Sequence, residues 1–465
     1  MSRVYLRLLT EDDASVSYKW RNNPAIWQYT GHRPDRNVTY EVELEWIQKV
    51  LQNGNEKRFA ICIQKTWQYI GNVQLTDING YDAAFHIFIG EKELWGQGYG
   101  FEATQLILEY GFDVLKLQSI YLDVKRKHST AIKMYQKARF FDLFEYDEYL
   151  RMAIFKTNDV LKKVSVFVIT YNHEKYIAEA LQGILNQRVD FDFDIVLGDD
   201  FSSDKTREIV LRYAIQNPGK FKLLFYPKNI SASVNQMWVL KNCSGTYIAM
   251  CEGDDYWICE KKLQKQVHFL DHDREFAICF HNSRILKEED TEAVAFSNNI
   301  NQKEVSTFED LALGEFIYTA TCMFRRTDIE KFPTEYYNYM YNYTMDLHNA
   351  QFGKIKYINE VMSVYRVHSG GAWSTVARDI TLINHMPTYR FYVAYFEKKY
   401  RPYFIAHLKS MTRELIEIKI AKKDYVNFWC YFKEYLRYNL MTKKEVKKAC
   451  YIFLLFVHHL SKRVY

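Results

Sequence analysis

Two clusters of acidic residues follow short apolar runs about fifty residues apart. The first cluster consists of Asp199 and Asp200, and the second of Glu252, Asp254 and Asp255. The preceding runs, 194–198 and 247–251, have the length and apolar character typical of buried parallel strands. Carboxylates crowded at the ends of such strands repel one another unless a cation joins them, and such oxygen ligands suit Mg²⁺ or Mn²⁺. The pattern indicates metal-assisted handling of a diphosphate.

Each of these acids could instead cap a helix or lie in a solvated turn, the usual place of aspartate. That alternative accounts well for Asp204, which precedes a helix-like segment, but poorly for two clusters that both end strand-like runs. A third run of this kind, 164–172, ends in a polar turn before helical spacing at 174–185. We therefore favour an active site at the ends of parallel strands.

Three motifs occur in a fixed order along this part of the chain. They are Thr170-Tyr171-Asn172, Asp199-Asp200-Phe201-Ser202-Ser203-Asp204 and Glu252-Gly253-Asp254-Asp255-Tyr256-Trp257. In this order they resemble the family 2 glycosyltransferases with the GT-A fold, over about residues 163–374. The resemblance implies that Thr170 and one of Asp199 or Asp200 contact the nucleoside of a nucleotide diphosphate sugar. The metal ligands it implies are Glu252, Asp254 and Asp255, with the glutamate in a place where many members have aspartate.

A third segment completes this resemblance. It implies that Asp346 is the catalytic base, which takes the proton of the acceptor hydroxyl during an inverting transfer. Arg366 and His368 resemble the loop that meets the diphosphate, and Gly370-Gly371 lets such a loop bend. The alternatives are that Asp346 only caps a helix, or that the base is one of two rivals. These rivals are Glu335 and Glu360.

The first third of the chain has a different pattern. Strand-like runs at 4–9, 59–63, 69–75 and 83–89 precede a glycine-rich turn at 94–104, which opens an amphipathic helix to about residue 115. Free backbone N–H groups at such a helix start can bind a pyrophosphate, although glycines often only make turns.

In this context the turn resembles the acetyl-CoA signature of the GNAT acetyltransferases, with Trp95 in the usual place of Arg or Gln. The resemblance implies that acetyl-CoA is the cofactor and that its pyrophosphate meets Gln97, Gly98, Tyr99 and Gly100. The segment 128–140 matches a further family motif and puts Tyr135 in the place of the general acid. His128 and Arg139 depart from the usual Asn and Gly. The alternative for Tyr135 is a core aromatic residue.

The amine acceptor is suggested by Trp20, Arg21 and Asn22. This string resembles GNAT enzymes that acetylate nucleotide-linked amino-deoxysugars, where the three residues would meet the amino-sugar substrate. The alternative is a helix C-terminus ended by Pro24. His86 is a candidate base for the amine, although a strand histidine is more often packed.

Composition favours two sizeable cores and a basic tail. The chain has 465 residues, 48% of them hydrophobic, and a net charge of +5. Residues 397–465 alone carry about +10, so the remainder of the chain is mildly acidic. Eight cysteines without CxxC spacing are typical of reduced core thiols, and no signal peptide is expected because the first residues run into a strand. We predict cytoplasmic localisation, with the tail either packed on the protein or touching the inner face of the cytoplasmic membrane. No nucleic-acid motif accompanies the charge.

The predicted fold class is α/β: a mixed α/β GNAT domain at 1–157, a Rossmann-like GT-A domain at 163–380 and a helical basic region at 381–465. The predicted function is a bifunctional transferase of surface-glycan synthesis. It would acetylate a nucleotide-linked amino sugar and transfer a sugar from a nucleotide diphosphate donor to a glycan or lipid-linked acceptor. In the alternative, the GNAT half acetylates a protein N-terminus or an assembled glycan, or serves as a non-catalytic binding module.

Overall fold

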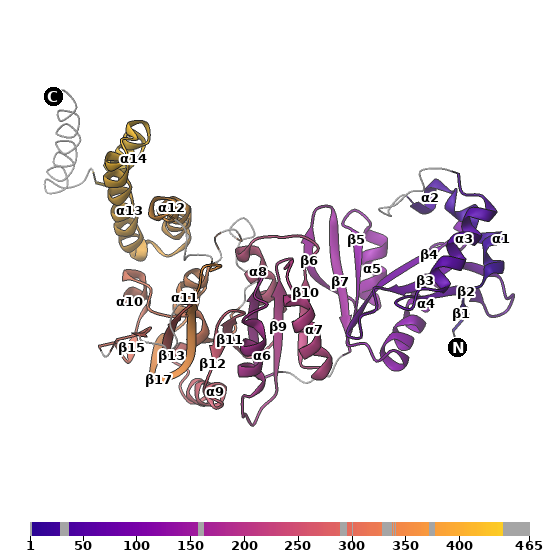
Figure 1. The fold of residues 1–465 in the computed structure, drawn as a ribbon, viewed down its shortest axis with the longest axis horizontal. Coiled ribbons are helices and arrows are strands. Elements are labelled where there is room, and N and C mark those ends of the chain that lie inside the picture. The colour runs from indigo at the N-terminus through magenta and orange to yellow at the C-terminus, as the bar shows by residue number, and fades with distance from the viewer. Residues whose placement is uncertain are drawn as a thin grey trace. The chain divides into compact units, whose positions relative to one another are not determined.

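The computed structural model describes residues 2–27, 37–156, 162–288, 295–299, 301–327, 337, 339, 341–371 and 377–439. These residues build two sheets with flanking helices, followed by a run of long helices (Figure 1). The α/β class with a helical C-terminal region is therefore confirmed. The rival base Glu335 and the end of the basic tail at 440–465 lie outside the described residues.

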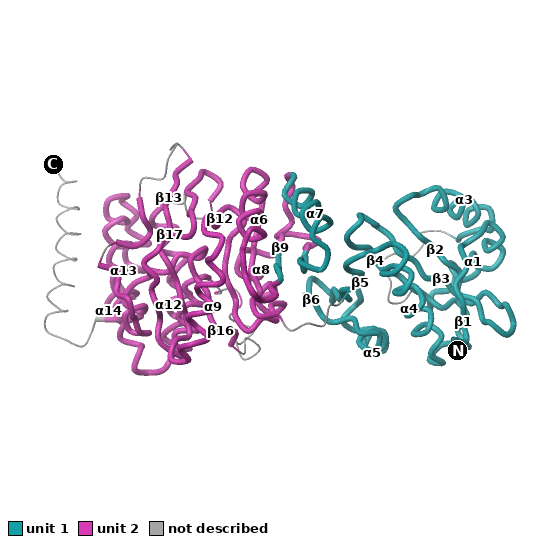
Figure 2. Tube along the Cα trace, turned by 90° about the horizontal axis from the view of Figure 1, so that it is seen from below, with its two compact units in different colours: residues 1–161, 194–197, 205–224 teal, residues 162–193, 198–204, 225–465 magenta. Residues whose placement is uncertain are grey.

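The chain divides into two compact units (Figure 2). The first comprises residues 1–161 with 194–197 and 205–224, and the second comprises residues 162–193, 198–204 and 225–465.

The first sheet has the strand order β1-β2-β3-β4-β5-β7-β6. Its strands are β1 (Val4–Leu8), β2 (Lys57–Ile63), β3 (Tyr69–Thr76), β4 (Asp82–Ile89), β5 (Ser119–Lys125), β6 (Phe141–Tyr146) and β7 (Tyr149–Phe155). All neighbours are antiparallel except β4 and β5, which are parallel and pair only as far as Ala84 and Tyr121. Beyond these residues the two strands diverge, so their facing backbone edges are not hydrogen-bonded to each other.

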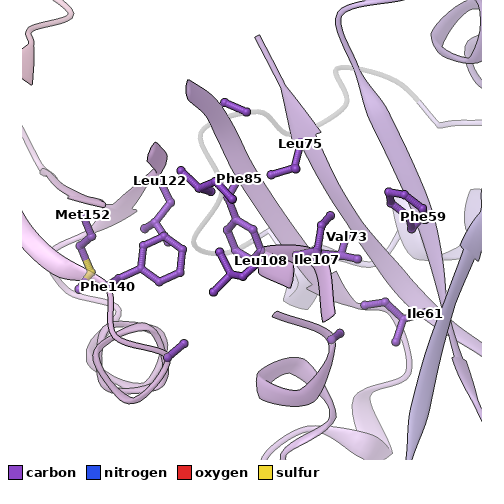
Figure 3. Packing of buried hydrophobic residues seen from close by; sticks show 14 of the residues in the cluster. Phe59, Ile61, Val73, Leu75, Phe85, Ile107, Leu108, Leu122, Phe140 and Met152 are labelled. Atoms are coloured by element: carbon purple, nitrogen blue, oxygen red, sulfur yellow. The ribbon is translucent and has the colours of Figure 1, made fainter. Parts of the chain in front are cut away.

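Helices cover both faces of this sheet. They are η1 (Glu11–Asp13), α1 (Ala14–Arg21), α2 (Pro24–Trp27), α3 (Tyr40–Leu51), η2 (Lys92–Leu94), α4 (Tyr99–Glu109), the π-helical turn η3 (Tyr110–Val114) and α5 (Ser129–Lys137). Strand alternation decides which side chains meet which helices. Phe59 and Ile61 of β2 pack in one core with Ile107 of α4 (Figure 3). Ala60 and Cys62, which alternate with them along β2, belong to a separate core with Trp20 of α1 and Ile47 of α3.

The second sheet has the order β10-β9-β8-β11-β16-β13-β17-β12, with β14 beside β13 and β15 beside β17. Its strands are β8 (Val164–Thr170), β9 (Phe193–Asp199), β10 (Phe221–Phe225), β11 (Tyr247–Glu252), β12 (Tyr256–Trp257), β13 (Phe276–Lys287), β14 (Ala295–Phe296), β15 (Val305–Ser306), β16 (Met323–Arg325) and β17 (Lys354–Val367). Strands β8 and β11 are parallel, with Glu252 opposite Ile169. Their carboxyl ends therefore meet at the same edge of the sheet.

The helices that follow these strands are α6 (Ile177–Leu185), α7 (Thr206–Gln216), α8 (Ala232–Asn242), α9 (Lys262–His272), α10 (Phe308–Leu313), η4 (Thr319–Thr321) and α11 (Asn342–Ala350). Helix α6 shows why these segments are helical, because its buried residues recur at helical spacing: Ile177, Ala180, Leu181 and Ile184. In α11 every residue from Tyr343 to Ala350 is buried, so this helix lies inside the second unit.

The C-terminal region is helical, with α12 (Arg378–Tyr395), η7 (Lys398–Tyr400), α13 (Arg401–Ala421) and α14 (Tyr425–Asn439). It packs on α11: the hydroxyl groups of Tyr392 and Thr344 are 2.7 Å apart, and the Tyr395 hydroxyl lies 3.0 Å from Nδ1 of His348. No helix among the described residues is both long and apolar enough to cross a bilayer.

An ion pair joins α12 to α13. The buried carboxylate of Asp379 accepts hydrogen bonds from Lys422 at 2.8 Å and from Lys419 at 3.0 Å. These hydrogen bonds, with that of Lys422 the stronger, lower the pKa of Asp379 to about 2. The stabilisation is therefore complete above the unfolded value of 3.8 and is lost as the pH falls through about 2.

We expect Asp379→Asn to speed hydrogen exchange in α12 and α13 at pH 7 and to have little further effect near pH 2, where the wild type has lost the same interaction. Comparison of the two proteins at each pH removes the intrinsic pH dependence of exchange. Glu417→Gln is the control, because its pair with Arg413 is about half exposed at both ends and contributes little. Equal exchange in wild type and Asp379→Asn at pH 7 would contradict the prediction.

Candidate functional site

The parallel ends of β8 and β11 bring two predicted motifs together. Thr170 ends β8, and the backbone N–H of Gly253, just past β11, donates to the carbonyl of Ile169 at 2.9 Å. A Cβ atom on Gly253 would lie 2.8 Å from Oγ1 of Thr170 and 2.9 Å from Nδ1 of His173. The acidic motif therefore needs glycine at this position, because any side chain would push the two motifs apart.

Asp254 lies between two histidines from other segments. Its Oδ2 is 3.1 Å from Nε2 of His368 and 3.6 Å from Nε2 of His173. One ligand atom from each of the three residues lies within 4.8 Å of the other two, which makes them a group that could hold a metal ion. Burial alone would raise the pKa of Asp254, but the hydrogen bond with His368 and the charge of His173 lower it. Its carboxylate is therefore ionised.

The other two predicted metal ligands have different neighbours. Oε1 of Glu252 accepts a hydrogen bond from Asn342 at 3.0 Å, and Oδ1 of Asp255 accepts one from the backbone N–H of Arg366 at 2.9 Å. Burial, followed by the charge of Asp254, raises the pKa of Glu252 to about 7 and that of Asp255 well above its usual value. The structure thus places all three acids together but presents only Asp254 to the histidines.

Arg366 ties β17 to the acidic motif. Its guanidinium donates to the carbonyl oxygen of Asp254 at 2.6 Å and pairs with Glu179 of α6. It also lies 4.3 Å from the ring centre of Tyr256 and 5.2 Å from that of Tyr176. Arg366 and His368, both predicted to meet the diphosphate, therefore lie directly against the acidic motif.

The predicted nucleoside contacts lie in a tight polar turn. Asp199 accepts from the backbone N–H of Ser202 at 3.0 Å, and Asp200 accepts from that of Ile230 at 2.6 Å. Two exposed aromatic residues at these turns, Tyr171 and Phe201, are each 48% exposed. Exposed aromatic rings at such a turn are of the type that can stack on a base. Sequence reasoning missed this pair, although both belong to the motifs it singled out.

Asp346, the predicted base, lies on α11 and is only 2% exposed. Its Oδ1 is 3.5 Å from Sγ of Cys322. Burial, followed by the charge of Glu315, raises the pKa of Asp346 well above its usual value, which favours its protonated form. In its ionised form the carboxylate would be a correspondingly stronger base. The rival Glu360 is about half exposed and forms an ion pair with Lys265, so it is engaged elsewhere.

In the first unit, the predicted pyrophosphate turn leads into α4 through Gly98, whose φ of 89° lies in the left-handed region that suits glycine. Arg3 lies against this turn: its guanidinium donates to the carbonyl of Gln97 at 2.8 Å and pairs with Glu102 at 2.5 Å. Among the described residues, the backbone N–H groups of 96–101 donate to no backbone carbonyl. Such amides at a helix start can bind an anion, and the pyrophosphate site at Gln97 to Gly100 stays a prediction.

Tyr135 lies where β4 and β5 diverge. Its ring contacts Phe85, the first residue of β4 past the paired segment, with ring centres 5.9 Å apart. Burial raises the pKa of Tyr135, so its hydroxyl keeps its proton at neutral pH. His86, the next residue along β4, lies 3.1 Å from Oγ1 of Thr76. Loss of solvation among the surrounding protein atoms, followed by the charge of Arg58, lowers the pKa of His86, so its imidazole is neutral.

The three residues assigned to the amino-sugar substrate have partners within the first unit. Trp20 is 5% exposed and donates to Glu91 at 3.1 Å, and Arg21 pairs with Glu43 at 3.1 Å. The amide of Asn22 holds the backbone of Val38 through two hydrogen bonds of 2.8 Å. These contacts favour a local structural role, and the contact of Trp20, Arg21 and Asn22 with an amino-sugar substrate stays a prediction.

Comparison with known proteins gives two family matches. A model described as Acetyltransferase (GNAT) domain matches residues 3–140, and one described as Glycosyl transferase family 2 matches residues 165–332. An uncharacterized protein of Mycobacterium tuberculosis is 34% identical over 222 residues, which are 46% of this chain and 62% of that protein. The chain therefore spans less than two thirds of this relative.

Two further relatives match the first third. The spermidine N(1)-acetyltransferase of Escherichia coli K12 is 31% identical over 168 residues, which are 33% of this chain and 86% of that enzyme. A crystal structure of spermidine N-acetyltransferase from Vibrio cholerae in complex with CoA and spermine matches at 26% identity and a TM-score of 0.31. The match covers 33% of this chain and 96% of the solved one.

The fold and the matches define two transferase modules in one chain. The chain belongs to the GNAT acetyltransferases through residues 3–140, and residues 165–332 match the family 2 glycosyl transferase model. Both resemblances found in the sequence motifs are confirmed. Asp346, Arg366 and His368 lie beyond the segment that the glycosyl transferase model matches.

We expect Gly253→Ala to weaken the binding of Mn²⁺ by roughly tenfold or more, because the new methyl group displaces Thr170 and His173 from Asp254. Titration of the Mn²⁺ electron paramagnetic resonance signal measures this affinity. Gly314→Ala is the matched control, since a Cβ atom there meets no atom within 4 Å. The prediction is wrong if both variants bind Mn²⁺ as the wild type does.

Proposed function

We propose that the chain is a bifunctional transferase of surface-glycan synthesis. Its second module transfers a sugar from a nucleotide diphosphate donor, with metal dependence and inversion. Its first module acetylates the amine of a nucleotide-linked amino sugar with acetyl-CoA. The observation that carries the proposal is the meeting of Thr170, Asp254 and His368 at the carboxyl ends of the parallel strands β8 and β11, inside a family 2 domain.

In the glycosyl transfer, the donor nucleoside lies against the turn of Asp199 and Asp200, and its diphosphate lies at Asp254 and Arg366. Asp346 accepts the proton of the acceptor hydroxyl as its oxygen attacks the anomeric carbon and the nucleoside diphosphate departs. A divalent ion held at Asp254, when bound, neutralises charge on the departing diphosphate. The buried Oδ2 of Asp255 has no hydrogen-bond partner among the described residues, which fits a nearby cation.

In the acetyl transfer, the turn from Gln97 to Gly100 holds the pyrophosphate of acetyl-CoA with its backbone N–H groups. The divergence of β4 and β5 leaves room for the acetyl arm beside Tyr135. His86 takes the proton of the acceptor ammonium, the amine attacks the thioester carbonyl, and Tyr135 gives its proton to the departing thiolate.

The acceptor of the acetyl group has two candidates of different chemistry. The fusion to a sugar transferase favours an amino sugar, whose acetylated form the second module would then use. The relationship to a spermidine N(1)-acetyltransferase favours a polyamine. Polypeptide N-termini and assembled glycans are the remaining alternatives. The proposed domains are 1–157, 163–380 and 381–465. The basic C-terminal region is further proposed to contact a membrane surface.

We expect Asp346→Asn to lower sugar transfer by about 10²-fold or more while donor binding is kept, because only the proton acceptor is lost. Mass spectrometry of products from a panel of nucleotide diphosphate sugars and glycan acceptors, with Mn²⁺ present, measures this. Glu360→Gln is the matched control and should keep full activity. Equal loss in both variants, or none in Asp346→Asn, would exclude Asp346 as the base.

We expect Tyr135→Phe to lower acetyl transfer by about 10²-fold, since the departing thiolate loses its proton donor. The assay offers acetyl-CoA with 4-amino-4,6-dideoxy sugar nucleotides, spermidine and an N-terminal peptide, and detects the added acetyl group by mass. Asp254→Ala should leave this reaction unchanged. Acetylation of spermidine alone would replace the amino-sugar assignment, and acetylation of none of the three would overturn the proposal for the first module.

A further inference from the structure

Helix α14 packs on α13 along one stripe of its surface. Its buried residues Phe428, Phe432 and Tyr435 recur at helical spacing and share a core with Ile416 and Ile420 of α13. This core fixes how α14 is turned about its own axis. The residues on the opposite stripe of α14 therefore point away from α13.

The opposite stripe of α14 combines apolar and basic side chains. Val426 at its start is 83% exposed, and Trp429 is 41% exposed. Lys433 and Arg437 follow about one and two turns after Trp429 and are also exposed. Neither of these two cations forms an ion pair among the described residues. Apolar and basic side chains thus lie together on one stripe that faces the solvent.

No acid offsets the charge of this stripe among the described residues. Glu434 is the one acid of α14, and it pairs with Arg390 of α12. In the turn before α14, the carboxylate of Asp424 lies 3.7 Å from the amine of Lys419. Lys423 in the same turn is exposed and forms no ion pair within the described part of the chain. The stripe and the turn before it therefore carry positive charge.

The exposed stripe of the neighbouring helix α13 has a different character. It includes Ala406, Ser410, Arg413 and Glu417, and the last two form an ion pair at 2.9 Å. Small side chains and paired charges are typical of an ordinary solvated surface. The stripe of α14 differs in both respects, because its side chains are large and its charges have one sign.

Exposed apolar residues gather at one end of the C-terminal helices. The large apolar side chains that the described part of this region exposes are Ile380, Ile383, Val426 and Trp429. The first two lie near the start of α12 and the other two near the start of α14. Asp379 in α12 accepts a hydrogen bond from Lys422, which precedes α14, so both helices start at the same end. An exposed apolar patch with basic neighbours is typical of a surface that binds a membrane.

We infer that this stripe of α14 binds the surface of a bilayer that contains anionic lipids. Val426 and Trp429 enter the head-group region, and Lys433 and Arg437 approach the lipid phosphates. Tryptophan is favoured at the head-group level of a membrane, and anionic lipids attract lysine and arginine. In the sequence, residues 440–465 add six lysines and arginines against one acid, which strengthens the same attraction. The inference rests on the proposed membrane contact of the C-terminal region, and it names the surface and the class of lipid.

The first test measures binding of the full chain to vesicles. One set consists of phosphatidylcholine alone, and the other of phosphatidylcholine and phosphatidylglycerol in a ratio of about two to one. We expect binding to the anionic vesicles only, and a loss of roughly tenfold or more when Lys433→Glu and Arg437→Glu are combined. Val426→Gln should also weaken binding, and its side chain is too exposed for the fold to depend on it.

A second double variant controls for net charge. Lys398→Glu combined with Lys399→Glu on η7 changes the net charge of the chain by the same amount, at two exposed positions outside α14. It should keep most of the affinity for the anionic vesicles. Equal weakening by the two double variants would show an effect of net charge alone and would overturn the inference.

A fluorophore at Cys430, an exposed residue on the stripe, reports directly on contact with lipid. The variants Cys259→Ser and Cys450→Ser make the label specific, since the remaining cysteines are buried. The emission of an environment-sensitive label at Cys430 should shift to the blue on anionic vesicles and stay unchanged with phosphatidylcholine alone. The control label, at Ser410→Cys on α13 in a chain that also carries Cys430→Ser, should keep its emission with both.

The outcomes separate this inference from the proposed function. Unshifted emission at Cys430 on vesicles that bind the chain would overturn the inference, whereas the proposed membrane contact would stand through other residues. Emission that is already shifted to the blue without vesicles would show that protein covers the stripe, and it would overturn the inference as well. No binding to either kind of vesicle would refute both the inference and the proposed membrane contact. Sugar transfer and acetyl transfer are measured separately and do not depend on these results.

Discussion

The parallel pairing of β8 and β11 is the constraint on which the second module depends. Parallel strands deliver their carboxyl ends to the same edge, and here Ile169 lies opposite Glu252, so the residues that follow each strand are neighbours. Gly253 permits the close approach, since its missing side chain leaves space for Thr170 and His173. A polar turn from one strand and an acidic turn from the other thereby form one site.

Hydrogen bonds of Asn342 join this donor side to the helix that carries the predicted base. Asn342 donates to Glu252 at 3.0 Å, and its carbonyl oxygen accepts from Gln236 of α8. It begins α11, the buried helix that carries Asp346 one turn later. The helix α12 packs on α11 through Tyr392. The C-terminal helices therefore support the element that positions the base, which gives the helical region a structural role beyond that of a tail.

The first module uses a different device for a similar ligand. Its proposed phosphate-binding elements are backbone amides at the start of α4, which carry no formal charge, and Arg3 beside this turn is paired with Glu102. Tyr135 contacts Phe85, the first residue of β4 past the segment that pairs with β5. Binding through backbone dipoles suits a cofactor that must leave after each turnover.

The sequence by itself determined both families, the α/β class and the order of the elements. Local sequence patterns predict strands, turns and helix starts. The patterns here are short apolar runs that end in acids and a glycine turn before an amphipathic helix. The helical periodicity of the C-terminal region is equally local, so its helices could be predicted. Tyr135 could be placed for the same reason, because its motif lies on one helix.

The tertiary structure alone decided which side chains meet. His173 and His368 are almost two hundred residues apart, and nothing local in the sequence shows that both face Asp254. Residue type and spacing do not distinguish the three neighbouring acids. In the structure, however, Glu252 accepts from Asn342 and Asp255 accepts from Arg366, whereas Asp254 faces the histidines. Spacing along the chain also does not show that Trp20 of α1 packs in one core with Ala60 and Cys62 of β2. Packing between distant segments is set by the whole fold, and therefore it cannot be read from spacing along the chain.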